Sequence, residues 1–150
     1  MRNLLSMPTV SMICRFFLGG VFFIFSTNYF LQFFAMPPMS AAGGGFMGSL
    51  AQTGYFFTLL KVTELAASVL LLTNIFVPLA VILLAPIVVN IFAFHLFLEP
   101  AGLPIAMILV ILESMMGWFY WSQFKPLFAI KRFRIAEDLP IITIKKQHPA

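Results

Sequence analysis

Charged residues are scarce in this sequence. Only 9% of its 150 residues are Asp, Glu, Lys or Arg, whereas 61% are hydrophobic, and the mean hydropathy is +1.02. Soluble domains carry about 25% charged and about 45–50% apolar residues. A chain this short cannot hide so much apolar surface in a soluble core. The composition therefore predicts an integral membrane protein with one compact domain.

Cysteine and histidine are also rare. Cys14 is the sole cysteine, so the chain can form neither an intramolecular disulfide nor a C-x-x-C motif, which excludes an autonomous dithiol oxidoreductase. No second expected span carries a histidine, so His95 cannot form a two-histidine haem site within one chain. His95 and Glu99 alone are too few ligands for a metal. We expect an interfacial His95, bonded to Glu99 or water, and no metal site.

The sequence consists largely of long apolar runs. About 20 apolar residues are needed to cross a bilayer, and the sequence offers four such segments, separated by stretches rich in Pro, Gly or Asn. The first, near the N-terminus, is expected to be a retained span rather than a signal peptide, because Arg15 interrupts it and no cleavage site follows. The predicted fold is an all-α membrane four-helix bundle within residues 1–126, with spans at about 11–34, 53–72, 76–97 and 103–124.

The net charge of +4 lies entirely in the C-terminal part of the chain, which carries six basic and two acidic residues from Lys125 onward. Arg2 precedes the first span, and the connecting loops contain no lysine or arginine. A basic excess marks the cytoplasmic side, so both termini are predicted to be cytoplasmic. The basic tail, residues 127–150, is expected to contact anionic lipids. The high pI is thus interpreted as membrane topology, with no nucleic-acid partner.

Two full charges, Lys61 and Glu64, lie inside the second span. They are three residues apart and therefore share one helix face. With Gly54, Thr58 and Ser68 they form a polar stripe that is expected to face the bundle interior. One interpretation is a structural ion pair that fixes helix packing; the other is a ligand or proton site, because ionisable groups inside a membrane are functional candidates by default. The sequence leaves both open.

The other spans contain comparable stripes, expected to face inward. These are Ser11, Arg15, Gly19, Phe22 and Ser26 in the first span, Pro86, Asn90 and His95 in the third, and Glu113, Gly117 and Trp121 in the fourth. Arg15 either extends to the inner head groups or pairs with Glu64 or Glu113. Glu113 has no partner in its own helix, which favours a role in proton exchange. The candidate ligand-binding or proton-relay residues are therefore Lys61, Glu64, Asn90, Glu113, Arg15 and His95.

Three pieces of the chain, "RFFLGGVFFIFSTNYF", "PPMSAAGGGFMGSLAQTGYFFTLLKVTELAASVLLL" and "FVPLAVILLAPIVVNIFAFHLFLEPAGLP", carry a family resemblance. The sequence resembles the DoxX-like family of small four-span bacterial membrane proteins. The positions that match the family are Arg15, Glu64 and His95. The chain departs from the family after Glu64, where Ala66 and Ala67 replace a glycine-rich segment. The resemblance implies a bacterial inner-membrane location and a link to redox systems, because the family is named after a subunit of a thiosulfate:quinone oxidoreductase.

Several functions remain open. The first hypothesis is an accessory membrane subunit that binds a quinone or similar lipid, with Lys61 or Asn90 donating to a quinone carbonyl and a redox protein as partner. The alternative is a non-catalytic scaffold that docks a partner through its basic tail. A small-molecule transporter ranks third, because four spans are few for alternating access unless the chain forms a homo-oligomer. No autonomous catalytic motif is present, so enzyme activity would be at most that of an oxidoreductase subunit.

Overall fold

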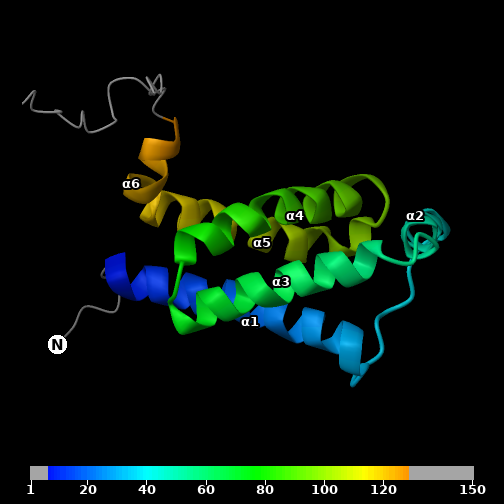
Figure 1. Ribbon diagram of the computed structural model, residues 1–150. Helices are drawn as coiled ribbons and strands as arrows, with labels where there is room; N and C mark the ends of the chain where they lie inside the picture. Colours follow the sequence, from blue (N-terminus) through cyan, green and yellow to red (C-terminus); the bar gives the residue numbers. More distant parts are fainter. Residues whose placement is uncertain (1–6, 129–150) are drawn as a thin grey trace, which may run out of the picture.

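The computed structural model describes residues 7–128, and within this range every regular element is helical (Figure 1). The elements in chain order are α1 (Met7–Leu31), α2 (Ala41–Ala51), α3 (Phe56–Thr73), α4 (Val77–Phe97), the 3-10 turn η1 (Pro100–Gly102), α5 (Leu103–Phe119), α6 (Trp121–Phe124) and the 3-10 turn η2 (Lys125–Phe128). The basic tail predicted at residues 127–150 lies outside the described residues, apart from Leu127 and Phe128.

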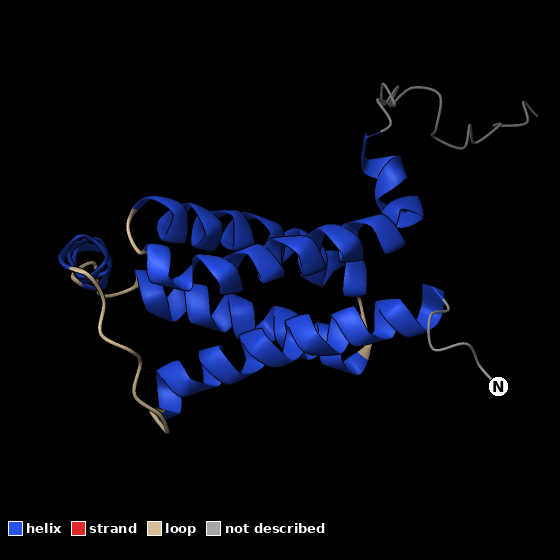
Figure 2. Ribbon diagram, turned by 180° about the vertical axis from the view of Figure 1, so that it is seen from behind, coloured by secondary structure: helices blue, strands red, loops and turns tan. Residues whose placement is uncertain are grey.

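Four segments are long and apolar enough to cross a membrane: α1, α3, α4 and η1 with α5. This confirms the all-α prediction with four candidate spans. The segments run alongside one another in an elongated bundle, with α2 across one end (Figure 1). The start of α1 and the short helix α6 both lie at the opposite end, as the view from behind also shows (Figure 2).

Each of the four spanning helices packs against two of the others, which closes the bundle. α1 packs against α3 and α5, and α4 packs against the same two helices. The core between them is built from Leu18, Leu71, Leu84, Val88 and Met116, all 2% exposed or less. At most 33% of each spanning window is buried, and the rest is covered with large exposed apolar side chains. Such an outer surface suits lipid rather than water.

The segment between the first two spans differs from the expected loop, because it contains α2. Ser40 caps this helix by accepting a hydrogen bond from the Gly43 amide at 3.0 Å, as serine does at helix starts. Its glycines, each costing about 1 kcal/mol in a helix interior, hid the helix from sequence analysis. The second span begins at Phe56 because Gly54 has φ +75° and cannot be helical. The prediction that Gly54 belongs to the polar stripe was wrong.

The fourth span also ends earlier than predicted. Tyr120, at φ −101° and ψ 13°, leaves the α-helical region, and α6 turns away from the bundle after it (Figure 1). Trp121 therefore belongs to another helix than Glu113 and is 55% exposed. The prediction that Trp121 continues the inward face of Glu113 was wrong, because neither glycine nor proline marks the break in the sequence.

Candidate functional site

Glu64 is the centre of a closed polar network inside the bundle. Its carboxylate oxygen Oε2 accepts hydrogen bonds from the Lys61 ammonium at 2.7 Å and from the Ser26 hydroxyl at 3.0 Å. Glu64 is 2% exposed, while the Lys61 side chain is 21% exposed. The two charges meet as their spacing predicted. Ser26 lies on the predicted inward stripe of the first span, but its bond to Glu64 was not foreseen, and it ties α1 to α3.

The network lies in the first half of α3. Because α3 begins only at Phe56, Lys61 lies about 8 Å and Glu64 about 12 Å along the helix from its start, at 1.5 Å per residue. The helix has 18 residues, so Glu64 lies near its middle and Lys61 about 5 Å from that point.

Arg15 binds the protein backbone rather than a carboxylate. Its Nη1 donates a hydrogen bond to the Leu71 carbonyl at 2.9 Å, and the guanidinium lies 4.9 Å from the Phe16 ring centre. Leu71 is in the last turn of α3, where carbonyls carry partial negative charge, and its oxygen also accepts the Asn74 backbone amide at 3.2 Å. The alternative in which Arg15 pairs with Glu64 or Glu113 was wrong, because residues 7–128 contain just one ion pair, Lys61–Glu64. Arg15 instead caps α3.

Glu113 is buried without any such partner. It lies on α5, faces the core and is 7% exposed, yet neither carboxyl oxygen makes a hydrogen bond within the part of the chain that the structure describes. Buried polar groups are nearly always hydrogen-bonded, and each exception calls for an explanation. Glu64 and Glu113 are the two buried carboxyls of this bundle, and only Glu64 is satisfied. Glu113 is therefore the stronger candidate for chemistry.

Asn90 does not face the other helices. It is exposed on α4, as is Pro86, whereas the buried face of this helix consists of Val77, Ala80, Val81, Leu84 and Val88. The predicted inward stripe of Pro86 and Asn90 was wrong. α4 is apolar around its whole circumference, so a polar residue carries no information about which face is buried.

His95 and Glu99 belong to a separate cluster at the α2 end of the bundle. The His95 ring bonds through Nδ1 to the Glu99 backbone carbonyl at 2.9 Å. The Glu99 carboxylate accepts the Ser40 amide at 2.6 Å, and the Ser40 hydroxyl donates to the Leu98 carbonyl at 3.0 Å. A Cβ on Gly43 would lie 2.7 Å from this carboxylate. These contacts fasten the start of α2 to the end of α4.

The structure thus separates the predicted candidates. Lys61 and Glu64 are together, Arg15 is at the far end of α3, Glu113 is alone, Asn90 points outward and His95 is in the α2 cluster. Across residues 7–128 no three His, Cys, Asp or Glu side chains come close enough to hold a metal ion. Sequence reasoning missed Ser40, which lies directly before the first residue of α2, where serine is a favoured N-cap.

No family model, no curated protein and no solved structure matches this chain. The resemblance to the DoxX-like family therefore stays a prediction.

Proposed function

We propose that this chain is an accessory subunit of a redox system in the bacterial inner membrane, and that it binds a quinone or a similar lipid-soluble molecule. The observation that carries the proposal is Glu113, a carboxyl that is buried among spanning helices with both oxygens unpartnered. An ionisable group in such a place is costly, and its usual justification is a ligand or a proton pathway.

Glu113 supplies the chemistry that a quinone needs from its protein. Reduction of a quinone to a quinol takes up two electrons and two protons. A carboxyl that no side chain holds can pass protons to and from a bound quinone. The electrons would come from a redox protein that associates with this chain, because the chain has no dithiol. Glu113 is thus assigned the proton-relay role.

Two features of the sequence support the membrane setting of the proposal. Arg2 and the basic tail flank an even number of candidate spans, which favours both termini in the cytoplasm. The resemblance to DoxX-like proteins favours the bacterial inner membrane and a redox partner. Lys61 and Asn90 are weaker donors for a quinone than expected, since Lys61 binds Glu64 and Asn90 points outward.

The test compares two isosteric variants of buried carboxyls, Glu113→Gln and Glu64→Gln. Each is reconstituted in lipid vesicles with a short-chain quinone and an electron donor, after a check that both are helical and monodisperse. The proposal expects Glu113→Gln to slow proton uptake on quinone reduction at least tenfold, with Glu64→Gln acting mainly on stability. Proton uptake that is unchanged in Glu113→Gln would remove the basis of the proposal.

A second candidate function, a non-catalytic scaffold, is favoured by the closed contacts between α1 and α3. Ser26–Glu64–Lys61 and Arg15–Leu71 are complete by themselves and need no ligand. In this case the basic tail would dock a partner protein or anionic lipid. Deletion of residues 129–150 should then abolish recovery of the partner while thermal stability is unchanged. A quinone site would survive that deletion.

A further inference from the structure

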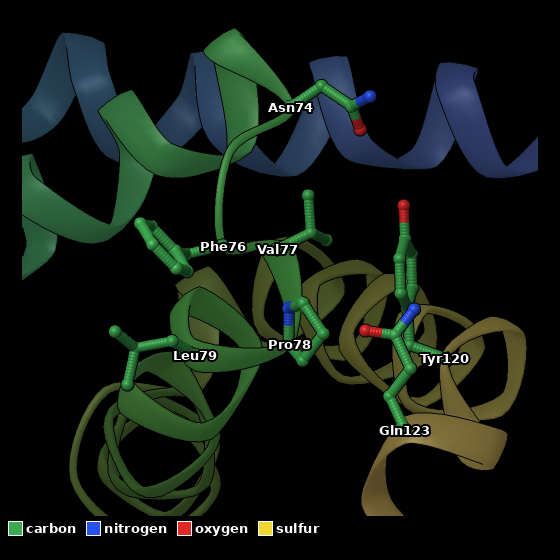
Figure 3. Close-up of a pocket in the computed structure, with 7 residues that line it drawn as sticks. All are labelled: Asn74, Phe76, Val77, Pro78, Leu79, Tyr120 and Gln123. Atoms are coloured by element: carbon green, nitrogen blue, oxygen red, sulfur yellow. The ribbon is translucent and has the colours of Figure 1, made fainter.

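A pocket opens where the α3–α4 turn meets the corner between α5 and α6; we call it the corner pocket. Its volume is about 560 Å³, within the 300–1,000 Å³ range of small-molecule sites. One wall is the start of α4, residues 76–79, and the other carries Tyr120 and Gln123 (Figure 3). Asn74 lies above them on the turn (Figure 3). The pocket exists because α6 turns away at Tyr120.

The polar groups of the corner pocket are uncharged and uncommitted. The side chains of Asn74, Tyr120 and Gln123 make no hydrogen bond to any residue in the range 7–128, and none of the lining residues described is charged. Amide and phenol groups donate to and accept from neutral oxygens. Phosphate and carboxylate ligands, in contrast, are typically held by arginine or lysine. The lining therefore matches an uncharged, hydrogen-bonding head.

A second hollow, the aromatic groove, lies along α4 and α5–α6 and has a volume of about 360 Å³. Small residues, Ala85, Ser114 and Gly117, leave its space open, and a Cβ added at Gly117 would meet no atom within 4 Å. Large aromatic side chains, Trp118 and Trp121 among them, border this open groove. This lining is apolar apart from Ser114 and suits a hydrocarbon chain.

The corner pocket and the aromatic groove are neighbours. On α4, Leu79 lines the first and Ile82 lines the second, one helical turn further on. On α6, Gln123 and Phe124 do the same at consecutive positions. On α5, Glu113 precedes the groove residue Ser114 and lies seven residues before Tyr120, about 10 Å along the helix axis. A head in the pocket would thus be two turns from the unpartnered carboxyl, so protons would pass between them through water rather than by a direct hydrogen bond.

We propose that the corner pocket and the aromatic groove together bind one amphiphile that has an uncharged hydrogen-bonding head and a long apolar chain. The head of the ligand lies against Tyr120, Gln123 and Asn74. Its hydrocarbon chain lies beside Gly117, between the two tryptophans. This inference deepens the proposed function and rests on it for the class of ligand. It adds the place and the orientation of binding.

The chain contains two tryptophans, and both line the aromatic groove, so their fluorescence reports occupation directly. The experiment titrates full-length protein in phosphatidylcholine nanodiscs with decylubiquinone, with diacylglycerol brominated on its chain, and with equally brominated phosphatidylglycerol. The variant Gly117→Leu fills the groove. Gly20→Leu is its matched control, since a Cβ at Gly20 on α1 also meets no atom within 4 Å. Native mass spectrometry gives the stoichiometry.

We expect saturable quenching by an uncharged amphiphile, at one molecule per chain, in wild type and Gly20→Leu. Gly117→Leu should weaken binding at least tenfold, and Tyr120→Phe should weaken it several-fold by removing the head contact. Preference for phosphatidylglycerol, or unchanged binding in Gly117→Leu, would overturn the site. Quinone binding that survives Gly117→Leu but responds to Glu113→Gln would refute this location and leave the proposed function standing. Saturable binding of diacylglycerol alone, lost in Gly117→Leu, would establish the site and refute the quinone function.

Discussion

The Ser26 hydroxyl donates a hydrogen bond to the Glu64 carboxylate across the contact between α1 and α3, at 3.0 Å, on the same oxygen that Lys61 occupies. Both residues are nearly inaccessible, at 0% and 2% exposure. Ser26 is therefore the link through which the ionic group of one span holds its neighbour.

Removal of this link should lower stability without unfolding the bundle. Ser26→Ala is expected to cost about 1 kcal/mol, the net value of one hydrogen bond, or somewhat more because the acceptor is charged. Thermal unfolding in a mild detergent, followed by circular dichroism, measures the change. Ser122→Ala, at an exposed position on α6, is the control. Equal melting temperatures for the two variants would contradict a bonding role for Ser26.

Glu64 and Glu113 should respond differently to the same substitution. Glu64→Gln leaves Lys61 without its carboxylate, and breaking a buried pair costs about 3–5 kcal/mol, which the 21% exposure of the Lys61 side chain should reduce. Glu113→Gln removes no hydrogen bond seen in residues 7–128, so its melting temperature should stay near that of wild type. A larger loss in Glu113→Gln than in Glu64→Gln would show that Glu113 has a structural partner.

Arg15 should stabilise the end of α3 in a way that lysine reproduces only in part. Its guanidinium donates to the Leu71 carbonyl at the helix C-terminus. Arg15→Met keeps much of the apolar side-chain volume but removes the donor, and should cost about 1.5–3 kcal/mol, as for hydrogen bonds that involve a charge. The stability of Arg15→Lys should lie between that of Arg15→Met and that of wild type. Hydrogen exchange of the last turn of α3 gives a local readout, which would stay unchanged if Arg15 served only to meet head groups.

The glycines around the His95–Glu99 cluster should differ sharply in their tolerance of alanine. A Cβ at Gly102 would overlap the His95 ring, and one at Gly43 would press on the Glu99 carboxylate. A Cβ at Gly45 would meet nothing within 4 Å, so Gly45→Ala should gain up to about 1 kcal/mol of helix propensity. We expect Gly102→Ala and Gly43→Ala to lower the melting temperature and Gly45→Ala to raise or preserve it. Uniform effects at the three positions would mean that α2 is not held at this corner.

Much of this fold could be predicted from the sequence because hydropathy alone marks the spans. Span positions, the contact of Lys61 with Glu64 and the inward face of the first span, with Arg15 and Ser26, all follow from composition and from helical spacing. These features depend on local periodicity, which a single sequence contains.

Other features depend on tertiary contacts that residue types do not encode. The partner of Arg15 is a backbone carbonyl, which is present at every position and cannot be distinguished in a sequence. α4 is apolar on all sides, so the outward position of Asn90 is decided by how its neighbours pack. The break at Tyr120 has no glycine or proline to announce it, yet it creates the corner pocket.

The order of the contacts along the chain has a consequence for assembly. The hydrogen bonds of α1 through Arg15, Ser26 and Tyr29 are all made with α3, the next spanning helix in the sequence. In a chain inserted from its N-terminus, Arg15, Lys61 and Glu64 can thus all find partners within the pair of helices α1 and α3, before α4 and α5 arrive. Glu113 enters with the last span, after Arg15 has bonded to Leu71 and Lys61 to Glu64.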